Sequence, residues 1–324
     1  MKLILPSVKF LGTALLMFLV SITMVACGGG GGDGPDGIIQ YTGLTSPALI
    51  TAGNAEELAT LAYLGGYGPA QLTVRDGSTK SAGGYPVLLY LYNFLADSVQ
   101  QAYQASAPGS RAIEIIDDFE LSTCPGSTGS LAYSLQVNDV SGAFTGSFTF
   151  YDYCENEVTF SGAITVSGVF DILNIQFTSL SLDLVEFTMA IGGESYTLDG
   201  YIDSMLVSPT TLELIIDLLL IDGSTDTVYW VNDFFLSITE EVFYTEVEVS
   251  GRFYSPLDGY VDLSTLTPIR IYYGDNAPFD GVLVLSGDFS SSAMLEFVSS
   301  TSFIVWVDAD GDDTFEWNTG EISW

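Results

Sequence analysis

The sequence predicts a mainly β protein: a large antiparallel meander that forms a closed or nearly closed barrel or a two-layer sandwich, with two N-terminal helices packed on it. From about Ile113 onward, apolar and polar residues alternate with the period of two that is typical of strands. No segment of helical length interrupts these runs, which argues against a parallel α/β sheet. We expect about ten to fourteen strands. Turn signals between them lie at Asp222-Gly223, Asp258-Gly259, Asp280-Gly281 and Asp310-Gly311.

The alternation identifies individual strand faces. Three apolar faces consist of Val158, Phe160, Ile164, Val166 and Phe170; of Leu212, Leu214, Ile216, Leu218 and Leu220; and of Val247, Val249 and Phe253. Gly251 interrupts the third face. The apolar phase slips between Leu184 and Phe187, which predicts a β-bulge there.

Two helices are expected before the strands. Asn54, with Glu57 three residues later, has the pattern of an N-cap and its capping partner, and Gly65-Gly66 ends that helix. The second helix fits residues 86–105, beginning with Pro86. Its apolar stripe consists of Leu88, Leu91, Leu95, Val99 and Ala102. We interpret this helix as a cover for one side of the sheet, with a ligand-lining helix as the alternative.

The first residues have the pattern of a secretory signal. Lys2 and Lys9 precede an apolar run that stays uncharged as far as Ala26. Glycines then dominate residues 28–37, which indicates a flexible tether. The chain is therefore divided into a signal peptide (1–26), a cysteine with its Gly-rich tether (27–37), a mixed helical segment (38–110) and an antiparallel β domain (111–324).

The segment Met24-Val25-Ala26-Cys27 resembles the lipobox of bacterial lipoproteins. This resemblance implies that Cys27 becomes the first residue and carries a diacylglycerol and a fatty acyl chain such as palmitate. In these lipoproteins an Asp directly after the cysteine retains the protein in the inner membrane. Gly28 at that position therefore implies export to the outer membrane of a Gram-negative cell. The resemblance thus predicts an envelope protein held by a membrane anchor, on either the periplasmic or the outer side.

Composition excludes several chemistries. The chain has seven Lys and Arg residues against 41 Asp and Glu, and its formal net charge is −34 at pH 7. A field of this sign repels nucleic acid. The chain contains no histidine, which rules out Ser-His-Asp and Cys-His catalysis and His-bound zinc or haem. Catalysis by a pair of carboxylates stays compatible with this composition, but 41 acids do not single out a pair. We favour a non-enzyme over an enzyme.

Cys124 and Cys154 are the two cysteines outside the lipobox. An even pair in an exported protein predicts a disulfide.

The last acidic loop is the only motif with metal chemistry. Asp308, Asp310 and Asp312 alternate as at the start of an EF-hand loop, and Glu316 is a candidate closing ligand. The resemblance to that loop is incomplete, because glycine falls at the fourth place and Thr319 takes the twelfth. Two interpretations stay open: a calcium site, or an Asp-Gly hairpin whose acids are solvated.

We therefore expect a lipid-anchored, non-enzymatic scaffold or interaction module with an envelope protein as partner. The first alternative is a carrier of lipid or another apolar ligand inside the β domain, which requires an internal cavity. The second is a glycan-acting enzyme, which requires two facing acids in a cleft.

Overall fold

The computed structural model describes residues 39–71, 113–138, 140–155, 158–171, 176–191, 194–273, 275 and 277–324. All of them belong to one compact unit, Gly37–Trp324. Cys27, the tether and the predicted helix at 86–105 lie outside the described residues. The side chains of residues 64–71, 113–119, 191 and 194 are likewise not described.

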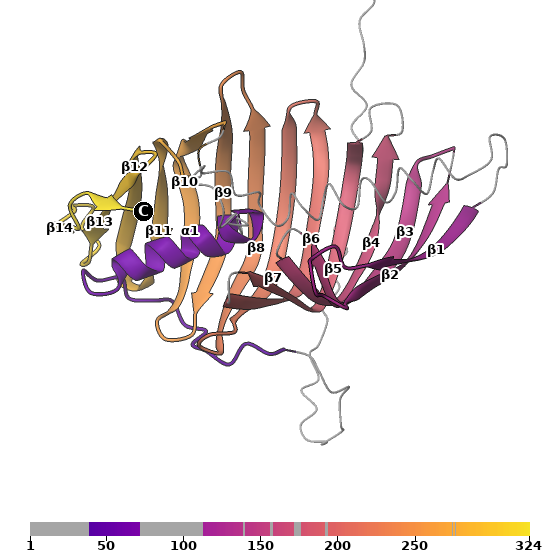
Figure 1. Ribbon diagram of the computed structural model, residues 1–324. Coiled ribbons are helices and arrows are strands. Elements are labelled where there is room, and N and C mark those ends of the chain that lie inside the picture. The colour runs from indigo at the N-terminus through magenta and orange to yellow at the C-terminus, as the bar shows by residue number, and fades with distance from the viewer. Residues whose placement is uncertain are drawn as a thin grey trace, which may run out of the picture. The chain divides into compact units, whose positions relative to one another are not determined.

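One antiparallel sheet of 15 strands contains every described strand, and its strands follow one another in chain order (Figure 1). The strands are β1 (Ile113–Leu121), β2 (Ser130–Asn138), β3 (Ala143–Glu155), β4 (Val158–Asp171), β5 (Gln176–Ile191), β6 (Glu194–Ser208), β7 (Thr211–Asp222), β8 (Thr227–Glu240), β9 (Tyr244–Ser255), β10 (Gly259–Tyr272), β11 (Asp280–Ser286), β12 (Ser292–Ser299), β13 (Ser302–Asp308), β14 (Trp317–Asn318) and β15 (Ile322–Ser323). A short 3-10 helix, η1 (Asp288–Ser290), joins β11 to β12.

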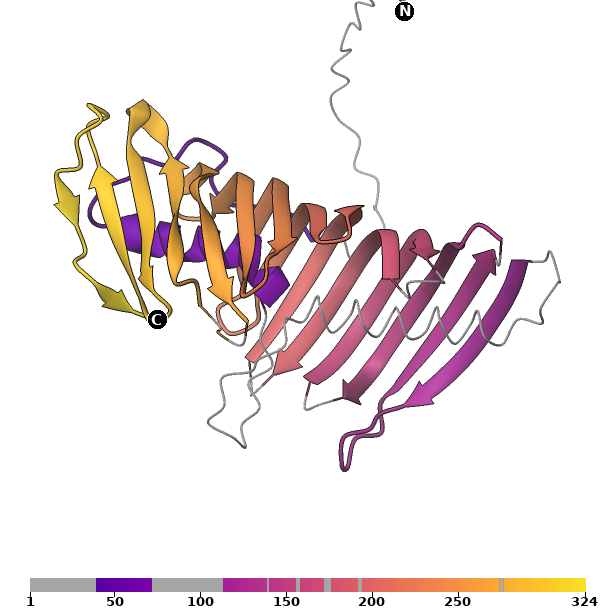
Figure 2. The same cartoon turned by 90° about the horizontal axis from the view of Figure 1, so that it is seen from above.

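The predicted meander is confirmed, but the predicted closure is wrong. The strand path begins at β1 and ends at β14, while β15 pairs with β13, so the sheet is open. Figure 2 shows β1 and the C-terminal strands at opposite ends of the row. The sheet is also continuous, so it is not a two-layer sandwich of separate sheets. Alternation of polar and apolar residues specifies one buried face, but it does not specify whether the two edge strands meet.

Helix α1 (Ala55–Gln71) is the one α-helix in the described part of the chain, and it packs across β8, β9, β12 and β13. The predicted start is confirmed: the helix begins directly after Asn54, whose carbonyl accepts the N–H of Leu58 at 2.9 Å. The predicted end is wrong, because the helix continues through Gly65-Gly66. Within the described residues, no helix has the length and apolar character needed to span a membrane.

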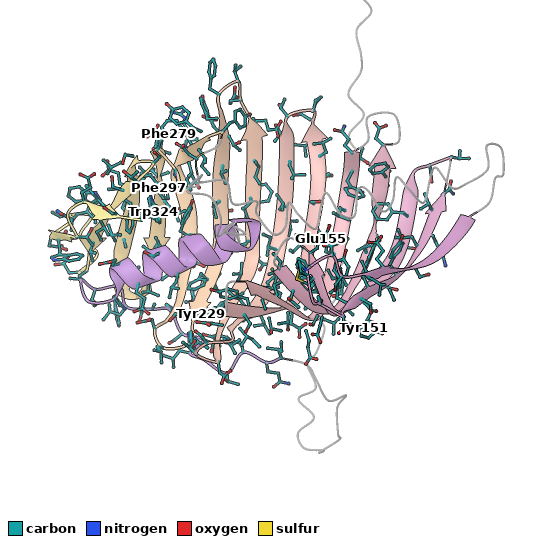
Figure 3. All side chains as sticks on the ribbon, viewed as in Figure 1. Tyr151, Glu155, Tyr229, Phe279, Phe297 and Trp324 are labelled. Atoms are coloured by element: carbon teal, nitrogen blue, oxygen red, sulfur yellow. A yellow bond between two sulfur atoms is a disulfide. The ribbon has the colours of Figure 1, made fainter. Side chains whose placement is uncertain are left out.

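The inner face of the sheet, defined as the face that contacts α1, holds the core. Leu58, Ala59 and Ala62 of the helix are fully buried in it. The ring centroids of Tyr63 and Phe297 lie 5.1 Å apart, and Trp324 packs beside both rings. Figure 3 shows Phe297 and Trp324 together at the C-terminal end. Further along, the inner face is rich in buried aromatic residues: Phe144, Phe148, Phe150, Phe160, Phe177 and Phe187.

A line of bulges and glycines crosses the middle of the sheet. β3, β5 and β8 each carry an acidic residue with positive φ at a register shift: Asp152 (49°), Glu186 (46°) and Asp233 (50°). Glycines with positive φ lie on the strands beside them: Gly162 (103°), Gly200 (134°) and Gly251 (144°). Each bulge restores the inward direction of the next apolar residue and bends the strand. The predicted bulge between Leu184 and Phe187 is therefore confirmed.

Candidate functional site

The acidic loop connects β13 to β14 as a hairpin. Asp308 ends β13, and only 2% of it is exposed. Its Oδ1 accepts the N–H of Gly311 at 2.8 Å, and its Oδ2 accepts the N–H of Asp313 at 2.9 Å. Both of these residues have positive φ, which tightens the turn around the carboxylate. The carboxylate of Asp308 therefore fixes the backbone of the loop through these two hydrogen bonds.

The other three predicted ligands are exposed, whereas Asp308 is buried. Ligand oxygens of Asp308, Asp310, Asp312 and Glu316 all lie within 4.8 Å of one another. Calcium–oxygen distances are about 2.3–2.6 Å, so oxygens on opposite sides of one ion are about 5 Å apart. The structure thus brings the four predicted residues together at a spacing that could hold one hard cation. The hairpin interpretation is also satisfied, because both interpretations share this turn.

Electrostatic repulsion concentrates at the exposed side of this loop. The charge of Asp312 raises the pKa of Asp310, with smaller contributions from desolvation and from Glu316. Glu316 Oε2 accepts the N–H of Ala309 at 3.2 Å, which returns the end of the loop to its start. A bound cation would relieve this repulsion between like charges.

The disulfide is confirmed: Cys124 and Cys154 are bonded, with their Cα atoms 5.5 Å apart. Cys154 lies near the end of β3, and Cys124 lies in the turn after β1. Backbone contacts support the bond, since the N–H of Thr123 donates to the carbonyl of Cys154 at 2.9 Å. The bridge thus connects the β1–β2 turn to β3.

Sequence reasoning missed an aromatic cluster on the outer face, the face opposite α1. Trp230 stacks on Tyr254 with ring centroids 4.4 Å apart, and Tyr41 packs against both rings. Arg252 forms two hydrogen bonds to Asp262, at 2.7 and 3.0 Å. The one sequence feature that could have predicted this cluster is Tyr41, an aromatic residue that precedes every strand.

The cluster fixes the segment that leads into α1. Burial, followed by the charge of Tyr254, raises the pKa of Tyr41 to about 12. Beyond it, Ser46 and Ala48 exchange backbone hydrogen bonds with Tyr260 at 2.9 and 2.7 Å. The cluster therefore joins the N-terminal segment to β8, β9 and β10.

A second feature of the outer face is a block of nine residues that we call the β5–β7 outer patch. Their register places three rows side by side across the strands: Asp183, Tyr201, Asp217; Ser181, Asp203, Ile215; and Ser179, Met205, Glu213. Tyr201, Met205 and Ile215 are 39%, 53% and 45% exposed. The patch therefore alternates acids with large apolar side chains that face solvent.

No family model, curated protein or solved structure matches this chain.

Proposed function

We propose that this chain is a lipid-anchored envelope protein that acts as a non-enzymatic interaction module. The anchor rests on the lipobox resemblance at Cys27. The observation that carries the interaction role is the outer face of the sheet. Large apolar side chains stand there in solvent, although the inner face buries its own almost completely: Val169, Val185, Tyr201, Met205 and Ile215. Apolar side chains grouped on an exposed surface mark sites of contact with other molecules.

The test combines anchoring with capture of a partner. The full chain is expressed in a Gram-negative cell with a photo-crosslinking residue at Thr145, Ser181 or Ser250, all on the outer face. The wild-type cysteine should incorporate a clickable palmitate, and Cys27→Ser should not. We expect a discrete crosslinked protein that is lost with the anchor. Absence of both acylation and crosslinking would refute the proposal.

Calcium binding at the β13–β14 loop is a second function that we propose. It is favoured by the four carboxylates within 4.8 Å, of which one is buried and held by backbone N–H groups. Few cations are available to neutralise these acids, since only Arg252 and Arg270 lie among the described residues and both form ion pairs.

Isothermal titration with calcium alone tests this second function. We expect one site per chain, absent in Asp310→Asn/Asp312→Asn, with Asp226→Asn/Glu240→Gln as the control of equal charge. Because protons compete with the metal for carboxylates, the affinity should fall as the pH is lowered through the raised pKa of Asp310. Equal binding by the two double variants would contradict a site at this loop.

A further inference from the structure

The β5–β7 outer patch has a charge and shape that specify a partner. We infer that it docks a short cationic segment of another protein in which Lys or Arg residues alternate with apolar ones. This inference deepens the proposed interaction role and rests on it.

The charge of the patch is not compensated within the described residues. Of the two cations described, Arg252 pairs with Asp262, and Arg270 pairs with Glu246 and Asp280. Asp217 accepts hydrogen bonds from Trp230 Nε1 and Asn232 Nδ2, each at 2.9 Å, but these donors are neutral. Neither of the two described cations therefore pairs with any of the four acids of the patch.

Tyr201, a member of the patch, lies among these acids. Desolvation, followed by the charges of Asp217, Asp233 and Asp203, raises the pKa of Tyr201 at the centre of the first row. Cationic groups on a partner would be attracted to such a surface, and the ring of Tyr201 offers a face for a cation–π contact.

The apolar members decide against a purely electrostatic partner. Ile215 lies opposite Asp203, and Met205 lies opposite Glu213, so apolar and acidic side chains alternate in two directions. Neighbouring strands are about 4.8 Å apart and alternate residues of one strand about 6.8 Å apart, so the block covers about 10 by 14 Å. This is the size of a short strand or two helical turns, not of a whole domain face.

Charge also excludes the other occupants. A second copy of this chain would bring eight acids together across a two-fold contact, and anionic lipid or nucleic acid would be repelled. A cationic segment is the occupant that satisfies both the acids and the apolar side chains.

The experiment measures binding of a synthetic 15-residue peptide of alternating lysine and leucine to the full chain in an uncharged detergent at physiological ionic strength. The patch variant is Asp183→Asn/Asp203→Asn/Glu213→Gln. The matched control is Asp226→Asn/Glu240→Gln/Glu241→Gln, which removes the same charge from exposed residues elsewhere. The patch variant should bind about tenfold more weakly, because three exposed ion pairs with the peptide would be lost, and the control should change little.

Two further arms complete the test. Met205→Ser/Ile215→Ser should weaken the lysine–leucine peptide but not a lysine–serine peptide of the same length. Equal weakening by the patch variant and its control would show attraction to net charge alone and would overturn the inference. Sedimentation that shows a dimer, dissociated by Met205→Ser/Ile215→Ser, would assign the patch to a second copy instead.

These outcomes separate the patch from the wider proposal. Envelope crosslinking that captures a partner, together with equal peptide binding by both triple variants, would refute only the patch. Failure of crosslinking at every outer-face position would refute the interaction role itself.

Discussion

Gly251→Ala should destabilise the protein by about 2–6 kcal/mol, because this glycine lies on the line of bulges that bends the sheet. Its φ of 144° belongs to a region that is almost exclusive to glycine, and holding another residue there costs about 1–3 kcal/mol. An added Cβ would also lie 2.6 Å from Phe234 Cα and 2.9 Å from the carbonyl oxygen of Asp233. Overpacking of this kind costs about 1–3 kcal/mol more.

Two control glycines separate these contributions. Gly126 has a φ of 83° but nothing within 4 Å of the added Cβ, so its substitution by Ala reports backbone strain alone. Gly53 has neither feature, since the nearest atom lies at 3.7 Å, and Gly53→Ala should change stability by less than about 0.5 kcal/mol. Equilibrium urea unfolding, followed by far-UV circular dichroism, should rank the losses 251, 126, 53. Equal losses at Gly251 and Gly53 would refute the reasoning.

Three further predictions concern single contacts. Cys124→Ala/Cys154→Ala should lower the unfolding free energy by about 3–4 kcal/mol. Urea unfolding of this variant, compared with the wild type with and without reductant, checks this. Hydrogen bonds from Ser224 lower the pKa of Asp222 in the folded protein below its ordinary value of 3.8. The ionised Asp222 therefore stabilises the fold above pH 3.8, and this stabilisation is lost as the pH falls through the lowered pKa. The melting temperatures of wild type and Asp222→Ala should converge in acid. The pKa of Tyr41 is raised from 10.0 to about 12 in the folded protein. Because the unfolded chain ionises first, the wild type should lose stability as the pH rises from 10 to about 12, and Tyr41→Phe should lose less. Melting curves at alkaline pH will show this difference.

Much of the sheet could be predicted from local pattern. The apolar positions of β4 and β7 point to the inner face as expected, because a strand with one buried face repeats every two residues. The bulge after Leu184 could be predicted for the same reason. Leu184 and Phe187 both point inward although they are three residues apart, which requires one extra residue between them. The grouping of the four acids could be predicted because all four lie within one loop, between residues 308 and 316.

Closure of the sheet and the outer-face features could not be predicted. Closure depends on whether the first and last strands meet, which no local period records. The β5–β7 outer patch depends on register, because Asp183, Tyr201 and Asp217 become neighbours only when three strands are aligned. The end of α1 was mispredicted because Gly65-Gly66 costs only about 1 kcal/mol per residue in a helix interior, an amount that other interactions can offset.

An open sheet of this width has two edges and an exposed apolar patch, both of which invite association between copies. The acids oppose this. β1, which pairs only with β2 among the described strands, carries Glu120 near its end, and a charged side chain at an edge disfavours pairing with a second copy. The same holds for the patch, where each exposed apolar side chain has an acid beside it. A surface that repels its own copies can keep apolar side chains in solvent without self-association. The electrostatic repulsion that opposes contact is absent only for a partner of opposite charge. Negative charge would therefore serve solubility and partner selection through one set of residues, which is why we expect neutralisation of the patch acids to weaken cationic binding and to promote self-association together.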